Sequence, residues 1–140
     1  MVIVIIAILM TVMLPVFLGA NSRAKDRAMQ ASLSTATTGA KSLYLAKADY
    51  TTATTPALTS EVGNLVFVAS AANPTGQNTI SVLPVTISQI ILSGTSKTGS
   101  CFYVLDDEAA GTTMYAKVNG VLGCAANTIT PADPAWKTTW

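Results

Sequence analysis

The chain has 140 residues, enough for one domain of ordinary size, and a formal net charge of +1 at pH 7. Charged residues make up 11% of the chain, well below the roughly 25% typical of soluble proteins. The low net charge argues against a nucleic-acid partner whose phosphates would have to be bound by basic residues. The absence of histidine removes the commonest general base and metal ligand. We therefore expect neither a nucleic-acid-binding protein nor an enzyme.

The N-terminal run is almost entirely apolar up to residue 18, with Thr11 and Pro15 as the exceptions. As a helix it would rise about 27 Å, close to the roughly 30 Å core of a bilayer. Residues 1–20 are therefore predicted to form a hydrophobic helix in a membrane or in a similarly apolar environment. Pro15 lacks an N–H group and crowds the carbonyl of Thr11, so we expect the helix to kink or open there.

Residues 21–50 are predicted to continue this helix in amphipathic form. The segment is poor in helix-forming residues around Gly39, so contacts with the rest of the chain must hold it. The whole helix would be about 75 Å long, far longer than a bilayer is thick. The predicted packing stripe recurs at spacings of 4, 3, 4 and 3 residues and consists of Met29, Leu33, Ala36, Ala40 and Leu43.

Residues 51–140 are predicted to form a globular β domain. The stretches NLVFVAS, SCFYVLDD and TTMYAKV have the composition of strands. In TISVLPVTISQIILS, Pro84 implies either two short strands or an edge strand, and Asn119-Gly120 is typical of a type I′ hairpin turn. The stretch TTATTPALTS is predicted to be a surface loop. We expect an α+β fold in which a small antiparallel sheet packs against the long helix.

The two cysteines, Cys101 and Cys124, are expected to form a disulfide, with two free buried thiols as the alternative. Closing this loop would stabilise the domain by roughly 3 kcal/mol on the chain-entropy view. A persistent disulfide indicates an oxidising compartment, whereas the basic residues after the apolar run favour a cytoplasmic location for the domain. A native chain that begins upstream of Met1, with its own basic leader, would resolve this conflict.

Two further features have alternative interpretations. Asp106, Asp107 and Glu108 fit a solvated loop between strands, or a calcium site, because calcium prefers oxygen ligands. Trp136 and Trp140 lie in a proline-containing tail and are expected to fasten the C-terminus to the domain, or to form a subunit contact or adhesive surface.

The first 50 residues resemble the N-terminal half of bacterial type IV pilins and type II secretion pseudopilins. The resemblance lies in the apolar run, its exit LPVFLG, the following RAKDRA and the tyrosine-containing helix end. About seven family residues, among them a phenylalanine and a glutamate, would precede Met1, and this sequence lacks both. The resemblance implies that Ala7, Thr11 and Pro15 lie where the helix unwinds in a filament. It also implies a filament core formed by Val2, Ile5, Ile6, Leu9, Met13, Leu14 and Phe17.

The resemblance further implies a structural role without cofactors. Subunits would wait in the inner membrane, be processed by a prepilin peptidase and methylated, and be assembled by a dedicated machine into an extracellular helical homopolymer. Such a filament would serve adhesion, attachment or twitching motility. The alternatives are a pseudopilin that builds a short periplasmic fibre for secretion, and a membrane-anchored domain that never polymerises.

Overall fold

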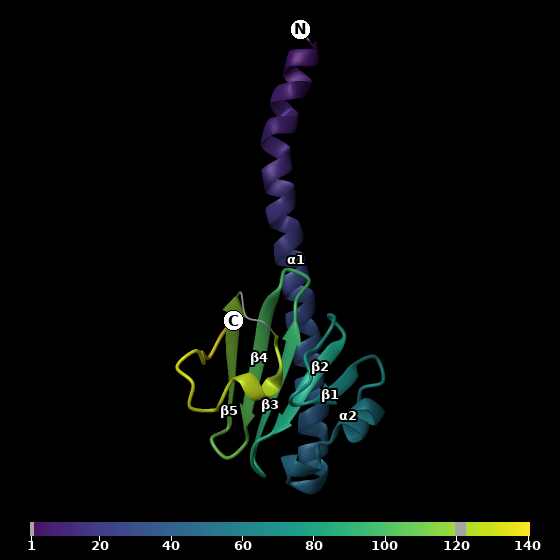
Figure 1. Ribbon diagram of the computed structural model, residues 1–140, viewed down its shortest axis with the longest axis vertical. Helices are drawn as coiled ribbons and strands as arrows, with labels where there is room; N and C mark the ends of the chain where they lie inside the picture. Colours follow the sequence, from purple (N-terminus) through teal and green to yellow (C-terminus); the bar gives the residue numbers. More distant parts are fainter. Residues whose placement is uncertain (1, 120–122) are drawn as a thin grey trace.

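A computed structural model of the chain describes the backbone of residues 2–119 and 123–140, and their side chains apart from those of residues 2, 4 and 7–18. A single helix, α1 (Val2–Lys47), is about 69 Å long at 1.5 Å per residue. Its C-terminal half packs across one face of a sheet, and its N-terminal half projects beyond it (Figure 1). We call α1 up to residue 24 the projecting segment and residues 26–140 the head.

The apolar stripe of α1 lies against the sheet. Met29, Leu33, Ala36 and Ala40 are completely buried, and Leu43 is partly buried beside them. The Met29 side chain lies directly over Gly94 of the sheet, where a Cβ atom would stand only 2.1 Å from the Met29 methyl carbon. Small residues on both elements therefore let α1 approach the sheet closely.

The Ser- and Thr-rich part of α1 remains helical because its hydroxyls bond within the helix. The hydroxyls of Thr35, Thr37 and Thr38 donate to the carbonyls four residues earlier, at 2.8–3.0 Å. The helix ends three residues before the predicted end. Ala48 adopts a left-handed φ of 53°, and Asp49 then caps the short 3₁₀ helix η1 (Tyr50–Thr52).

The sheet has five strands in the spatial order β1-β2-β3-β4-β5. They are β1 (Val66–Ala69), β2 (Thr79–Pro84), β3 (Gln89–Thr95), β4 (Ser100–Asp107) and β5 (Thr112–Asn119). Strands β2 to β5 pair antiparallel, but β1 and β2 are parallel. The prediction of a purely antiparallel sheet is wrong at this pair, because residues 70–78 return the chain to the starting end of β1 before β2 begins.

The interrupted apolar stretch forms two separate strands. Pro84 is the last residue of β2 and lies opposite Ile90, and β3 begins at Gln89. Because β2 lies between β1 and β3, the edge-strand alternative is wrong. Pro84 has no N–H to donate, and the end of a strand is where the sheet tolerates that loss.

The hairpin turns that the structure describes connect β3 to β4 and β4 to β5, with Gly99 and Gly111 at φ values of 82° and 63°. The predicted turn at Asn119-Gly120 falls partly on residues 120–122, which lie outside the described residues. In the described part beyond it, only Lys137 pairs with the sheet, through one bridge to Tyr115.

The predicted loop TTATTPALTS contains a helix, α2 (Thr55–Glu61). Pro56 stands in its first turn, where a missing N–H leaves no hydrogen bond unmade. Leu58 is completely buried, so α2 is fixed to the core by its apolar side. The prediction failed because proline is as compatible with a helix start as with a loop.

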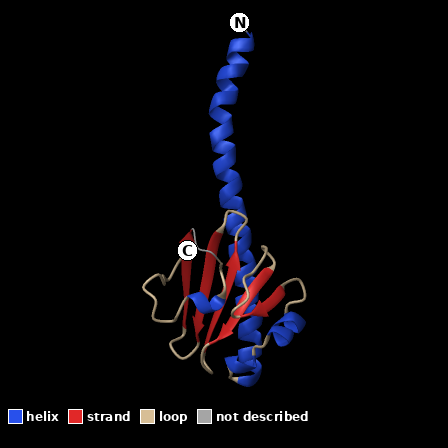
Figure 2. Cartoon of the chain, viewed as in Figure 1, coloured by secondary structure: helices blue, strands red, loops and turns tan. Residues whose placement is uncertain are grey.

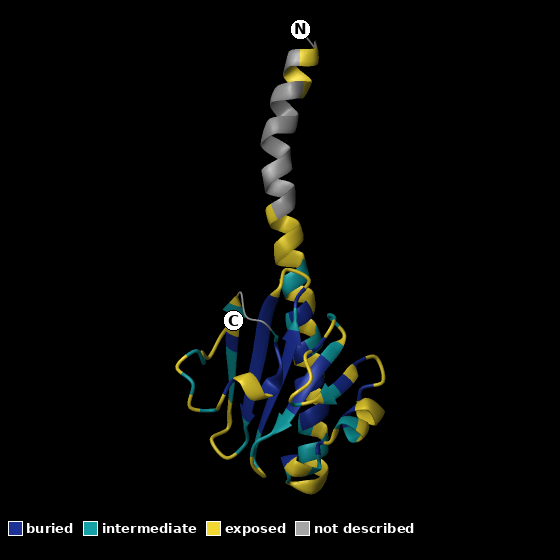
Figure 3. Cartoon of the chain, in the orientation of Figure 1, coloured by how far each residue is buried: buried dark blue, intermediate teal, exposed yellow. Residues whose placement is uncertain are grey.

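Both faces of the sheet are covered. On one face, a core of side chains from α1, η1, α2 and the sheet includes Phe102 and Val104 of β4. On the opposite face, residues 123–140, which we call the C-terminal segment and which include the 3₁₀ helix η2 (Ala126–Thr128), cover Tyr103 and Leu105. Central β3 and β4 are thus buried on both sides (Figures 2 and 3).

Within the described residues, no helix combines the length and the apolar character needed to cross a membrane. The apolar run predicted to do so falls mostly on residues 7–18, whose side chains lie outside the described residues.

Candidate functional site

The projecting segment of α1 exposes large apolar side chains. Ile3, Ile5 and Ile6 are 83%, 59% and 48% exposed. Of the other residues predicted for a filament core, Val2, Leu9, Met13, Leu14 and Phe17 have side chains outside the described residues. The backbone of Ala7, Thr11 and Pro15 belongs to the continuous α1 of the single chain, and their unwinding in a filament stays a prediction.

A polar cluster centred on the buried Asp106 joins α1 to the C-terminal end of β4. Lys41 of α1 lies 2.9 Å from Asp106 Oδ1 and 2.9 Å from Glu108 Oε1. Asp106 is only 1% exposed and also accepts hydrogen bonds from the hydroxyls of Tyr50 and Thr113. The carboxylate thus has three donors from three elements, which offsets the loss of its hydration on burial.

The cluster changes the protonation of its members. Burial by itself lowers the pKa of Lys41, but the carboxylates of Glu108 and Asp106 outweigh it and raise the pKa above the ordinary 10.5. Burial and the Asp106 carboxylate raise the pKa of Tyr50 well above its ordinary 10.0. Lys41 therefore stays an ammonium and Tyr50 a hydroxyl donor, which suits a structural link.

The acidic triplet does not form the solvated loop that was expected. Asp106 and Asp107 lie in β4, and only Glu108 lies in the turn after it. Asp107 accepts a hydrogen bond from the Gln89 side chain at 2.7 Å, which lowers its pKa. Across the described residues, no group of three Asp, Glu, Cys or His side chains is placed to hold a metal ion. A calcium site here stays a prediction.

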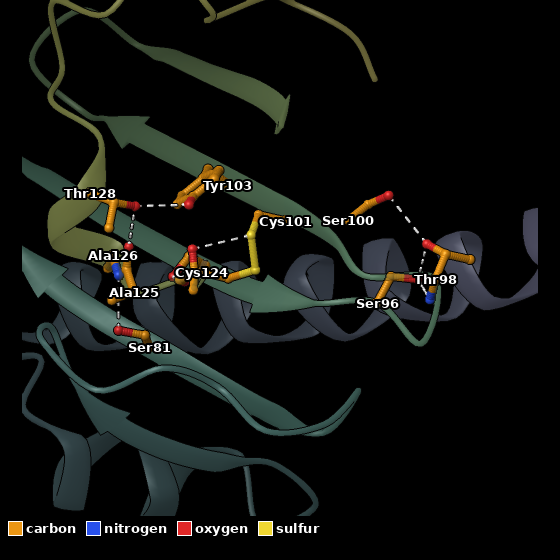
Figure 4. Close-up of a disulfide and its surroundings, with 12 residues drawn as sticks. Ser81, Ser96, Thr98, Ser100, Cys101, Tyr103, Cys124, Ala125, Ala126 and Thr128 are labelled. Atoms are coloured by element: carbon orange, nitrogen blue, oxygen red, sulfur yellow. Dashed lines mark hydrogen bonds between the residues drawn. A yellow bond between two sulfur atoms is a disulfide. The ribbon is translucent and has the colours of Figure 1, made fainter. Parts of the chain in front are cut away.

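The C-terminal segment is held to the outer face of the sheet by a disulfide and by buried hydroxyls. Cys101 of β4 and Cys124 form the predicted disulfide, with Cα atoms 5.1 Å apart (Figure 4). The Ser93 hydroxyl donates to the Cys124 carbonyl at 2.6 Å, and Ser81 Oγ accepts from the Ala126 N–H at 3.0 Å. Tyr103 and Thr128 share a hydrogen bond of 2.8 Å. Hydroxyls of β2, β3 and β4 thus hold the C-terminal segment to the sheet by hydrogen bonds.

The two tryptophans lie on different sides of the sheet. Trp136 is partly buried on the outer face, and its indole N–H donates to the Thr130 carbonyl at 2.8 Å. Trp140 packs instead against Phe102, which belongs to the core on the α1 face, and against Tyr115. The C-terminal segment therefore crosses the edge of the sheet next to β5.

Sequence reasoning missed Lys41, Tyr50 and Thr113 as a unit with Asp106. Lys41 directly follows the buried Ala40, which marks it as a cation next to the packing stripe. Its partners lie 65 and 67 positions away in the sequence, however, and no local pattern identifies them.

Comparison with known proteins gives no match to a family model, to a curated protein or to a solved structure.

Proposed function

We propose that the chain is a structural subunit of the type IV pilin kind, which polymerises through the projecting segment of α1 into a helical filament. The observation that carries the proposal is a disulfide-bonded head on a long helix whose first described side chains, Ile3, Ile5 and Ile6, are exposed isoleucines. Burying a large aliphatic side chain contributes about 1.5–3 kcal/mol, so this segment favours an apolar environment. Copies of the same segment, bundled with their heads outward, would supply one.

The head suits a subunit that carries load. Force applied along α1 would pass into the sheet through the buried stripe and the Lys41–Asp106 pair. The disulfide holds the C-terminal segment to the opposite face of the sheet. We propose an inner-membrane pool before assembly, maturation by a prepilin peptidase, and a surface filament for adhesion, attachment or motility. This role requires neither a catalytic group nor a cofactor.

The test is immunoelectron microscopy of material sheared from the native host, with an antibody against the head. We expect labelled fibres several nanometres wide for the wild-type chain. Ile5→Asp introduces a charge that neither a bilayer nor an apolar bundle accommodates, so this variant should give no fibres. Leu45→Asp is the matched control, because Leu45 lies on the same helix, is 85% exposed and belongs to the head.

The disulfide-bonded mass of each variant, together with an unchanged circular dichroism spectrum, shows that its head has folded. Monomers alone from the wild-type chain, or normal fibres from Ile5→Asp, would refute the proposal. Short fibres that remain in the periplasm would instead assign the chain to the pseudopilins.

A further inference from the structure

The rings of Trp140, Tyr115 and Phe102 form an aromatic platform at the β5 edge of the sheet. The C-terminus lies beside β5 there (Figure 1). The ring of Trp140 is 4.7 Å from that of Tyr115 and meets the ring of Phe102 nearly edge-on at 5.3 Å. Phe102 is completely buried, whereas Trp140 is 44% exposed. Two underlying rings therefore hold the indole in a fixed orientation while leaving much of its surface open to a ligand.

The platform separates two hollows, and both include Tyr115 and Trp140 in their lining. The hollow toward α1 has a volume of about 170 Å³, and the one toward the end of β5 about 290 Å³. Each hollow by itself is smaller than the roughly 300–1,000 Å³ of small-molecule sites, so a ligand of that size would have to occupy both. The remaining lining of the first is Ser34, Thr37, Thr38, Lys41 and Thr113, and that of the second is Ala116, Lys117, Asn119, Ala135, Lys137 and Thr139.

The charges around the platform nearly cancel. Lys41 is paired with Asp106 and Glu108, and Lys117 is 2.7 Å from Asp26. In the described part of the chain, Lys137 is the lining cation for which no ion pair is found. A polyanion such as single-stranded nucleic acid requires a track of unpaired cations beside the stacking rings. Among the described residues that line the two hollows, Lys137 alone would have to serve as this track.

The chemistry of the lining favours a neutral sugar. The face of an aromatic ring carries partial negative charge and attracts the C–H groups on the flat side of a pyranose. The Asn119 amide can both donate and accept hydrogen bonds, and the Thr38 hydroxyl, which donates to the Ser34 carbonyl, can still accept one from a sugar hydroxyl. We propose that Trp140 and Tyr115 form the platform of a binding site for a neutral oligosaccharide, which lies across both hollows.

This inference goes beyond the proposed function and does not depend on it. The site belongs entirely to the head and uses no residue of the projecting segment. A chain that binds sugar but forms no fibres would leave the inference standing. A chain that forms fibres but binds no sugar would overturn the inference alone.

The experiment follows Trp140 directly, because the chain has two tryptophans. In the full chain carrying Trp136→Phe, Trp140 is the one remaining indole. The protein is kept in a detergent without a sugar headgroup, and its emission is followed during titration with trisaccharides of glucose and of N-acetylglucosamine. We expect a saturable change with at least one of them. A trisaccharide of uronic acid and a short oligothymidylate, as anionic probes, should give none.

Substitutions then locate the binding by calorimetry. Trp140→Ala should weaken it about tenfold or more, and Trp140→Phe should retain part of it, because the stacking surface is the main contact. Asn119→Ala, at an exposed position, should weaken it about threefold through one lost hydrogen bond. Trp136→Ala is the matched control on the opposite face and should bind as the wild type does.

Three results would overturn the proposal: no response to either neutral trisaccharide, binding of the anionic probes alone, or undiminished binding by Trp140→Ala. An intact disulfide mass and an unchanged circular dichroism spectrum show that Trp140→Ala is folded. If they differ from the wild type, Asn119→Ala decides the question, and its undiminished binding would overturn the site.

Discussion

Asp106 is the residue on which three elements of the head converge. Its carboxylate is almost completely buried and accepts from Lys41 of α1, Tyr50 of η1 and Thr113 of β5. A buried carboxylate is tolerated when both of its oxygens accept hydrogen bonds. Its removal leaves the groups that donated to it without an acceptor. The unequal exposure of the two acids bonded to Lys41 distinguishes their contributions.

We expect Asp106→Ala to lower the free energy of unfolding by about 2–4 kcal/mol, because the hydroxyls of Tyr50 and Thr113 lose their acceptor while Lys41 keeps Glu108 and water. Glu108→Ala is the matched control, since its side chain is 27% exposed and its pair with Lys41 is partly solvated. Its loss should remain below about 1 kcal/mol. Urea unfolding of the full chain measures both, and equal losses would contradict this account.

At the scale of elements, a second polar cluster joins α1 to the near end of the sheet. Asp26 accepts from Ser96 and Thr98 of the β3–β4 turn at 2.7 and 2.6 Å, and from Lys117 of β5 at 2.7 Å. Burial by itself raises the pKa of Asp26, but these hydrogen bonds outweigh it and lower the pKa below the ordinary 3.8. The helix, the turn and the edge strand are therefore linked through one ionised carboxylate.

This link predicts a loss of stability in acid. A carboxylate whose pKa is lower in the folded state contributes stability above its unfolded value, here 3.8, and loses it as the pH falls through the folded value. Unfolding measured between pH 2 and 7 should therefore show a smaller decline below pH 4 in Asp26→Asn than in the wild type. Some decline should remain, because the pKa of Asp107 is lowered as well. Identical profiles would show that Asp26 contributes nothing.

On the scale of the whole molecule, α1 belongs to two environments. From Met29 onward its buried stripe is part of the core, while residues 19–24 are exposed all round. Stability is rarely uniform along such an element, and a stretch with few tertiary contacts opens more often than a packed one. Residues 19–24 are therefore expected to open more readily than the packed part of α1 that begins at Met29.

Limited trypsin digestion of the full chain in detergent should make its first cut at Arg23 or Arg27, both exposed at the junction between the projecting segment and the head. Mass spectrometry should then find the head as one disulfide-bonded fragment that resists further cleavage. A variant with glutamine at both arginines and at Lys25 is the control and should remain intact for longer. A first cut at Lys97, in the β3–β4 turn, would contradict this division of the molecule.

Some of the fold follows from local patterns. The stripe from Met29 to Leu43 repeats at the helical period, so it identifies a buried helix face without reference to any partner. Runs of β-branched and aromatic residues predicted the positions of the strands well. The two cysteines allow one intramolecular disulfide, and the structure contains it. The helix α2 was missed, because Pro56 is as compatible with the start of a helix as with a loop.

The sequence by itself therefore determined the elements: a long helix with one apolar stripe, a set of short strands and a disulfide. Only the tertiary structure decided how these elements meet, namely the parallel pairing of β1 with β2, the link from Lys41 to Asp106, and the position of Trp140 beside Tyr115. The physical reason is range. Periodicity and propensity act over a few residues, whereas these contacts join segments far apart in the sequence, whose faces become neighbours only when the chain has folded.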